Sequence, residues 1–438
     1  MDGSRADSVA LVALGCRVGR ADAGSVAADL PPGFREAAPG ESPAWVVVST
    51  CSVTADAAAS SRQAVRRAAR EHPGARIVVA GCHARAEEGD LAAIPGVAAV
   101  VGPRDHAALP LLLERLRAGE APEEALVAAR AESPDWVASP RPGTGPARPV
   151  LKIQDGCDGA CAYCSVPIFR GVARSLPLAA CLARIASHGA HRDEVVLSGV
   201  HLGGWGRDLA PRRSLAELVR AVAAARTVHR LRLSSIEPLE LPLDLVAGEG
   251  GALLCEHFHL PLQSGSDRLL VAMGRPYRAA EYATIVEAAW RVRPGAAIGA
   301  DVMAGFPGET EADHRATLSF LASLPIAYVH VFPFSPRPGT RAEAMGGRPP
   351  PGEVARRVAE LRALSARRRA AFQEGLRGRE LEVVVERVRG PVASGTSREY
   401  APVRFPARGA TRGSVVRVRA GDEGVQVGSG VAGDAAPS

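Results

Sequence analysis

Three cysteines within residues 151–174 have the number and spacing of thiols that can hold a reactive metal centre. Cys157, Cys161 and Cys164 form a C-x3-C-x2-C pattern. Thiolates bind iron–sulfur clusters, and four of them occupy every iron of a four-iron cluster. Three leave one iron without a protein ligand, and an open metal position is typical of catalytic sites. The alternatives are a structural zinc site, which favours four ligands in C-x2-C pairs, and unligated reduced thiols.

A second set of three cysteines follows three successive apolar runs near the N-terminus. The cysteines are Cys16, Cys51 and Cys82, and the runs before them span 9–15, 45–50 and 76–81. A fourth run at 97–102 and helical stretches at 60–72 and 105–119 predict a doubly wound parallel α/β domain. Parallel strands end at one edge of a sheet, so we expect the thiols to converge there. One such cysteine would be an ordinary buried residue, but three indicate a second cluster with an open site.

Another β-α series fills the middle of the chain. Its apolar runs lie at 148–154, 194–199, 229–235, 257–262, 297–305 and 327–333, with helical stretches such as 214–226 and 279–292 between them. Six parallel strands with crossover helices predict an open (β/α)6 partial barrel with its functional residues at the strand carboxyl ends. The polar, Gly-rich loops there suit a ligand with a ribose, an amine or a carboxylate. The candidate ligand-binding residues in or beside these loops are Gly199, Ser234, Gln263 and Asp301.

Changes in composition mark the remaining boundaries. Residues 120–150 are expected to be irregular, with a Pro- and Gly-rich linker at 138–149. Residues 352–377 predict a basic helix, in which the cluster 367–369 of three arginines is a candidate RNA contact. The expected domains are an N-terminal domain over 1–137, the linker 138–149, a barrel domain over 150–377 and a small β-barrel over 378–438.

The C-terminal region is basic and rich in short alternating strands. These runs lie at 380–387, 400–407 and 414–421 and predict a small β-barrel. Eight arginines and one acid lie between Arg387 and Arg419, which fits an electrostatic RNA-binding appendage. A packing or solubility module is the alternative. The tail after Gly430 is expected to be disordered.

Composition limits the remaining possibilities. The chain has 438 residues, is 47% hydrophobic and carries a net charge of +6. Lys152 is the only lysine among 53 basic residues, which we attribute to a general compositional bias toward arginine. No stretch reaches the ~20 apolar residues of a membrane span, and the N-terminus lacks a signal-peptide pattern, so we expect a cytoplasmic protein. There, cysteines favour metal or plain thiols over disulfides, and Cys181 and Cys255 are expected to be structural.

Several long motifs resemble those of the methylthiotransferases of the radical S-adenosylmethionine (SAM) superfamily, and of their MtaB-type branch in particular. The motifs are KIQDGC (152–157), GVHLGGWG (199–206), RLRLSSIEP (230–238), LPLQSGSDRLL (260–270), DVMAGFPGETE (301–311) and HVFPFSPRPGT (330–340). The resemblance covers residues 8–430 and implies a C-terminal TRAM domain. It implies that Cys157, Cys161 and Cys164 hold a [4Fe-4S] cluster that cleaves SAM. Cys16, Cys51 and Cys82 would hold a second [4Fe-4S] cluster that carries the sulfur.

The same resemblance implies a substrate and partners. The expected reaction adds a methylthio group to carbon 2 of N6-threonylcarbamoyladenosine at position 37 of tRNA. The expected partners are the tRNA anticodon loop and an electron donor protein, with no membrane, no DNA and a monomeric state. Alternatives are the same reaction on N6-isopentenyladenosine, methylthiolation of a ribosomal protein aspartate, and a non-enzymatic RNA binder with structural metal. One departure from the family pattern is Gly19, where an Asn is usual, which leaves open what supplies polar contacts near Cys16.

Overall fold

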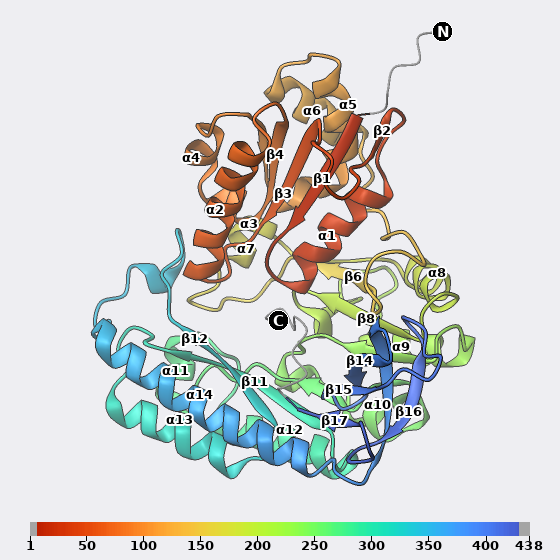
Figure 1. Cartoon of the computed structure of the whole chain (residues 1–438). Helices are drawn as coiled ribbons and strands as arrows, with labels where there is room; N and C mark the ends of the chain where they lie inside the picture. Colours follow the sequence, from red (N-terminus) through yellow and green to blue (C-terminus); the bar gives the residue numbers. More distant parts are fainter. Residues whose placement is uncertain (1–6, 429–438) are drawn as a thin grey trace. The chain divides into compact units, whose positions relative to one another are not determined.

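The structure, a computed structural model, describes residues 7–428 (Figure 1). Its described residues form two compact units, one of residues 7–145 and 165–172 and the other of residues 146–164 and 173–428. The chain therefore leaves the second unit directly after Cys164 and rejoins it at Ala173. The domain boundaries expected from the sequence remain predictions. The tail predicted to be disordered lies outside the described residues.

The first unit is built on a parallel sheet in the order β2-β1-β3-β4-β5. Its strands are β1 (Asp7–Ala13), β2 (Phe34–Glu36), β3 (Trp45–Thr50), β4 (Arg76–Gly81) and β5 (Val97–Val101). All neighbouring pairs run parallel, and β3 is buried along its whole length. Strands buried on both faces are continuous apolar runs, which explains why the sequence revealed four of the five. The three-residue edge strand β2 was missed.

Helices cover both faces of this sheet, which confirms the doubly wound α/β architecture (Figure 1). The helices are α1 (Arg17–Ala28), α2 (Ala55–Glu71), α3 (Cys82–Ala86), α4 (Glu88–Ala92), α5 (Leu109–Arg117) and α6 (Pro122–Glu132), with a 3-10 turn at Pro103–Ala108 and α7 (Val166–Arg170). One core joins α1, α5 and α6 to the sheet, and the other joins α2, α3 and α4.

The expectation that residues 120–150 are irregular was wrong for helix α6. The helix starts with Pro122 and has Glu123 and Glu124 in its first turn, all favourable at a helix N-terminus. It buries only Ala125 and Ala129. Two small residues one turn apart make too weak an apolar stripe to be recognised in a sequence.

The second unit contains the six parallel strands that the sequence predicted. They are β6 (Val150–Asp155), β8 (Glu194–Gly199), β9 (Arg230–Leu233), β10 (His257–His259), β11 (Ala297–Ala304) and β12 (Tyr328–Pro333). They form the sheets β7-β6-β8-β9 and β10-β11-β12, where β7 (Arg174–Ser175) is an additional antiparallel edge. Backbone hydrogen bonds join the two sheets, from Cys255 N–H to the Leu231 carbonyl (2.8 Å) and from Ile236 N–H to the His259 carbonyl (3.0 Å).

Helices surround the strands of the partial barrel. The longer ones are α8 (Leu178–Gly189), α9 (Leu215–Ala225), α12 (Ala279–Val292), α13 (Glu311–Ser323) and α14 (Pro351–Glu374), with shorter α10 (Leu243–Ala247) and α11 (Asp267–Ala272). In α14, Arg368 donates to the Ala322 carbonyl and Arg369 lies 5.5 Å from the Tyr328 ring centre. Two members of the predicted RNA-contacting cluster thus have contacts within the unit. Among residues 7–428, no helix is long and apolar enough to cross a membrane.

The C-terminal domain is a five-stranded antiparallel sheet in the order β16-β13-β14-β15-β17. Its strands are β13 (Glu380–Arg389), β14 (Val392–Ser397), β15 (Pro402–Pro406), β16 (Val415–Arg419) and β17 (Gln426–Val427). The sequence predicted β13, β15 and β16. It missed β14 because VASGTS lacks large apolar residues.

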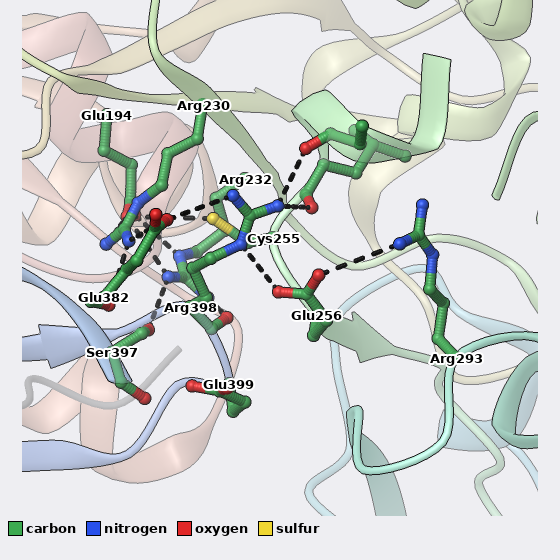
Figure 2. A network of polar contacts seen from close by, with 12 residues as sticks. Glu194, Arg230, Arg232, Cys255, Glu256, Arg293, Glu382, Ser397, Arg398 and Glu399 are labelled. Carbon is green, nitrogen blue, oxygen red and sulfur yellow. Dashed lines mark hydrogen bonds and ion pairs between the residues drawn. The ribbon is translucent and has the colours of Figure 1, made fainter. Parts of the chain in front are cut away.

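A buried network of charges binds this domain to the barrel (Figure 2). Glu194 on β8 is fully buried, and its two carboxylate oxygens accept hydrogen bonds from Arg230 and Arg232 on β9, each of 2.7 Å. The arginines also donate to backbone carbonyls of the C-terminal domain, Arg230 to residues 382 and 396 and Arg232 to residues 397 and 398. Arg398 donates in turn to Glu256 at 2.7 Å. The C-terminal domain therefore supplies acceptors that two buried guanidinium groups of the barrel require.

Substituting Glu194→Gln should destabilise the protein by about 3 kcal/mol, because Arg232 then loses its buried counter-charge and Arg230 keeps only the longer ion pair with Glu382 at 3.9 Å. Urea unfolding of the reduced, metal-free chain measures this change. The control is Glu374→Gln, which removes an exposed partner of Arg377 and should change stability by less than about 0.5 kcal/mol. Equal effects of the two substitutions would contradict this account.

The ionisation of Glu194 should make the stability of the folded protein depend on pH. Burial tends to raise the pKa of Glu194, but Arg232, Arg230 and Arg148 outweigh it and lower the pKa from 4.5 to about 2. A carboxyl with a lowered pKa in the folded state stabilises above its unfolded pKa and loses that contribution as the pH falls. The stability difference between wild type and Glu194→Gln should therefore shrink between pH of about 4.5 and about 2.

Candidate active site

Cys16, Cys51 and Cys82 lie at the carboxyl ends of three adjacent strands of the first unit. Cys16 precedes α1 in the turn after β1, Cys51 directly follows β3, and Cys82 is the first residue after β4. The Cys51 thiol is hydrogen-bonded to Cys16 and interacts electrostatically with Cys82. The three thiols therefore lie together, although 35 and 31 residues separate them along the chain.

Small residues and hydroxyl groups hold this edge in place. Gly15 has a φ of +87°, and a Cβ built on it would lie 2.2 Å from the Cys51 Cβ, so only glycine lets the two loops approach. Ser61 on α2 accepts from the Cys51 N–H at 3.0 Å and donates to the Cys51 carbonyl at 3.1 Å. Thr50 donates to the Ala80 carbonyl at 2.7 Å. These contacts fix the backbone beside Cys51 and Cys82.

A hydrogen bond and a nearby positive charge favour the thiolate form of Cys16. The hydrogen bond from Cys51 is the main cause that lowers the pKa of Cys16 to about 6, against burial, with help from Arg170 and the Gly19 backbone N–H. The pKa of Cys51 is raised by the same hydrogen bond and by burial. Arg170 is buried and paired with Asp22 at 3.0 Å. The Gly19 backbone thus supplies a polar contact at the position where the family usually has Asn.

Cys157, Cys161 and Cys164 lie in the loop between β6 and α7. The Gln154 side chain on β6 donates to the carbonyls of residues 155 and 156, at 3.0 and 2.8 Å, and accepts from the His201 N–H at 2.6 Å. The Cys164 N–H donates to the Cys161 carbonyl at 3.2 Å. The start of the loop is therefore held by hydrogen bonds to the strand from which it leaves.

Two polar groups that sequence reasoning did not single out contact these sulfurs. Nδ1 of His201 lies 3.7 Å from Cys157 Sγ, and its Nε2 is 2.8 Å from Glu240. Hydrogen bonds with Cys157 and Glu240 raise the pKa of His201 to about 10. Nη1 of Arg275 lies 3.4 Å from Cys161 Sγ, and Arg275 also pairs with Glu237. His201 and Glu237 lie in strand-end loops that the sequence predicted to bind a ligand, and Glu240 lies two residues beyond the second of these loops.

Gly199, Ser234, Gln263 and Asp301 occupy different environments in the barrel. Gly199 ends β8, and a Cβ there would lie 2.8 Å from the Gln154 Cβ, so the glycine allows close packing onto β6. Ser234 follows β9 and is buried, and its hydroxyl has no hydrogen-bond partner among the described residues. Gln263 follows β10 with a φ of +74°, and its N–H donates to the Asp301 carbonyl at 2.7 Å. The structure thus brings Gln263 and Asp301 together, while the contacts of Gly199 run to β6.

The Asp301 side chain belongs to a polar group within the barrel. Its Oδ1 lies 2.8 Å from Nε2 of His259 and 3.3 Å from Nδ1 of His330. Burial would raise the pKa of Asp301, but His259 and His330 outweigh it and lower the pKa. Nδ1 of His259 is 3.1 Å from the Tyr328 hydroxyl, which is 2.6 Å from Nε2 of His257. Asp301 is therefore held by two histidines, and its availability to a ligand remains a prediction.

The surroundings of Cys157 and Cys161 fit an iron–sulfur cluster. All six thiols are free, and five are partly exposed. The N–H of Gly159 points at Cys157 Sγ at 3.3 Å, and the Arg275 guanidinium lies beside Cys161. N–H donors and positive charge beside the sulfurs stabilise the negative charge of a thiolate-bound cluster.

Comparison with known proteins assigns the chain to a family. The radical SAM superfamily matches residues 151–321, and the uncharacterized protein family UPF0004 matches residues 8–102. The threonylcarbamoyladenosine tRNA methylthiotransferase MtaB of Aquifex aeolicus is 35% identical over 347 residues, which cover 77% of this chain and 83% of the relative. MtaB of Chlamydia pneumoniae is 33% identical, with 91% of each chain covered. This chain belongs to the radical SAM methylthiotransferases.

Other relatives widen the comparison. The tRNA-2-methylthio-N(6)-dimethylallyladenosine synthase of Erythrobacter litoralis is 34% identical, with 81% of each chain covered. Among solved structures, the radical SAM methyltransferase TsrM of Kitasatospora setae matches with a TM-score of 0.56, 17% identity and 77% of each chain covered, which supports the fold. Membership confirms the MtaB-type interpretation and the enzyme class. A radical SAM methylthiotransferase uses SAM and a [4Fe-4S] cluster.

The contact between Cys16 and Cys51 predicts selective thiol chemistry in the metal-free chain. With a pKa of about 6, Cys16 should be mostly thiolate at neutral pH and should react with iodoacetamide far faster than buried Cys181, whose pKa burial raises to about 12. Cys51→Ala removes the hydrogen bond and should move the pH midpoint of Cys16 alkylation upward toward the ordinary thiol value. Mass spectrometry of tryptic peptides measures both rates. Equal labelling of Cys16 and Cys181 would contradict the geometry.

Proposed function

We propose that this methylthiotransferase modifies carbon 2 of N6-threonylcarbamoyladenosine at position 37 of tRNA. The observation that carries the proposal is the presence of two sets of three thiols, each at the carboxyl-end edge of a parallel sheet. The names of the MtaB relatives point to threonylcarbamoyladenosine as the base. The hydrogen on carbon 2 of adenine is not acidic, and this carbon carries no leaving group. Acid–base residues alone could therefore not replace the hydrogen, and a cofactor radical is required.

The six cysteines take separate roles in this proposal. Cys157, Cys161 and Cys164 hold the [4Fe-4S] cluster, which when bound supplies the electron that cleaves SAM. Cys16, Cys51 and Cys82 hold a second [4Fe-4S] cluster at which the transferred sulfur is bound. Gly199, Ser234, Gln263 and Asp301 line the SAM pocket, and the unpartnered buried hydroxyl of Ser234 supports a polar ligand there.

Positive charge on the C-terminal domain indicates where tRNA would bind. The C-terminal domain is proposed to bind the anticodon loop through exposed arginines, among them Arg404 on β15 and Arg417 and Arg419 on β16. Reduction of the first cluster requires an electron donor protein. We also propose that the enzyme acts in the cytoplasm as a monomer.

The second candidate substrate is N6-isopentenyladenosine in the same tRNA position. The relative from Erythrobacter litoralis, whose name specifies the dimethylallyl base, matches this chain as closely as the MtaB relatives do. The chemistry at carbon 2 is the same for both bases, so the two candidates differ only in which N6 group the enzyme recognises.

Iron content tests the assignment of the cysteines. Protein purified without oxygen should hold about eight iron atoms, and Cys16→Ala should hold about four, because two remaining thiols bind the second cluster poorly. Cys181→Ala is the control and should keep the wild-type iron content, since Cys181 is buried and lies in α8. Full iron in Cys16→Ala would remove Cys16 from the ligand set.

Nucleoside analysis tests the substrate. Transfer RNA from a strain that lacks the gene should lose the 2-methylthio form of threonylcarbamoyladenosine, and a plasmid copy should restore it. A copy with Cys157→Ala should not restore it. Mass spectrometry of digested tRNA measures the nucleosides. Loss of the isopentenyl counterpart instead would refute the first candidate in favour of the second.

A further inference from the structure

The single lysine of the chain occupies an unusual position. Of 53 lysine and arginine residues, 52 are arginine, so every positively charged position other than residue 152 is filled by arginine. Only seven basic side chains among residues 7–428 are buried, and Lys152 is one of them. A general compositional bias explains the arginines but not why one buried position beside the cysteine loop keeps a lysine.

Lys152 forms a buried ion pair at the point where β6 becomes the cysteine loop. Its Nζ donates to Oδ2 of Asp155 at 2.9 Å, and both side chains are 2% exposed. The other carboxylate oxygen of Asp155 accepts from the Gly156 N–H at 2.9 Å. Gly156 has a φ of +69°, and Cys157 follows it. The carboxylate that Lys152 binds therefore caps the turn from which the first cysteine projects.

An irregularity in β6 makes this pair possible. Residues three apart in a regular strand face opposite sides of the sheet. The register of β6 on β8 shifts between Lys152 and Gln154, where Lys152 pairs with Ser198 but Gln154 already pairs with Gly199. The shift lets Asp155 meet Lys152, and the ion pair in turn stabilises the shifted strand end.

A guanidinium suits this position poorly. Its planar fork carries five N–H donors, whereas an ammonium is compact and carries three. The buried arginines of the barrel have extended sets of acceptors, as Arg232 does with Glu194 and two carbonyls of the C-terminal domain. Lys152 sits beside Ser198, which is 1% exposed, and the larger guanidinium of an arginine in this buried position would have to displace its neighbours.

We propose that Lys152 is a positioning residue, which through Asp155 holds the turn at Gly156 in the geometry that the cysteine loop needs to bind its cluster. Arginine at this position would keep the charge but move the carboxylate and the turn. The inference rests on the proposed role of Cys157, Cys161 and Cys164 as cluster ligands.

The test is made in a chain that carries Cys16→Ala, Cys51→Ala and Cys82→Ala, so that iron reports only the first cluster, at about four atoms per chain. In this background, Lys152→Arg should fold with an unchanged circular dichroism spectrum but hold less than half of the iron. The spin-resonance signal of the reduced cluster should respond less to added SAM. The matched control is Arg174→Lys, because Arg174 is the partly exposed second cation near Asp155, at 3.6 Å, and it should keep full iron.

Two further variants make every outcome decisive. Cys157→Ala should lose the iron, and if it does not, the ligand assignment itself fails, whatever Lys152→Arg does. The double variant Lys152→Met with Asp155→Asn removes both charges at similar volume and should also fold with reduced iron. Full iron in Lys152→Arg, or in the double variant if Lys152→Arg does not fold, would overturn the proposal. If neither Lys152→Arg nor the double variant folds, the proposal is overturned too, because the Lys152–Asp155 ion pair would then be required for folding of the barrel.

Discussion

Both candidate metal centres depend on one geometric constraint, that the parallel strands of a sheet all end at the same edge. In the first unit this constraint brings together thiols that follow β1, β3 and β4. In the barrel it gathers the cysteine loop after β6 with His201, Glu237 and Ser234 from the next two strand ends. The chain therefore needs no special local fold for either centre. It needs only strands buried well enough to be rigid, and side chains small enough, such as Gly15 and Gly199, for the loops to approach each other.

The barrel carries an unusual number of buried or half-buried polar and charged side chains on its strands. Aromatic residues make up 4% of the chain, and inward positions on neighbouring strands carry Glu194, Arg230, Arg232, His259, Asp301 and His330. Buried ions are costly unless each is paired and hydrogen-bonded, and here each has a partner on the next strand or in the C-terminal domain. Such pairing requires accurate placement of strands, which also serves a site whose ligands must be held in fixed positions.

Apolar periodicity predicted the parts of the fold in which strands are buried on both faces. The bounds of β3, β4, β8 and α12 were predicted to the residue, and those of the other barrel strands within a few residues. The elements missed include β2, β7, β14, β17, α1 and α6. They are short or made largely of small residues, and their structure depends on neighbours distant in sequence. The six cysteines stood out because their type is rare and their spacing regular. His201 and Arg275 did not, because nothing in the sequence shows that their side chains approach sulfur atoms.

The contacts of Arg230 and Arg232 with backbone carbonyls have a consequence for how this protein can change over evolution. Because the acceptors are carbonyls, almost any sequence at 396–398 could supply them, provided the backbone keeps its course. The side chains at these positions are thus free to vary as far as these contacts are concerned, but the domain cannot be shortened or exchanged without removing backbone acceptors of two barrel arginines. Attaching this domain to another enzyme through the same contacts would require that enzyme to carry an equivalent pair of arginines.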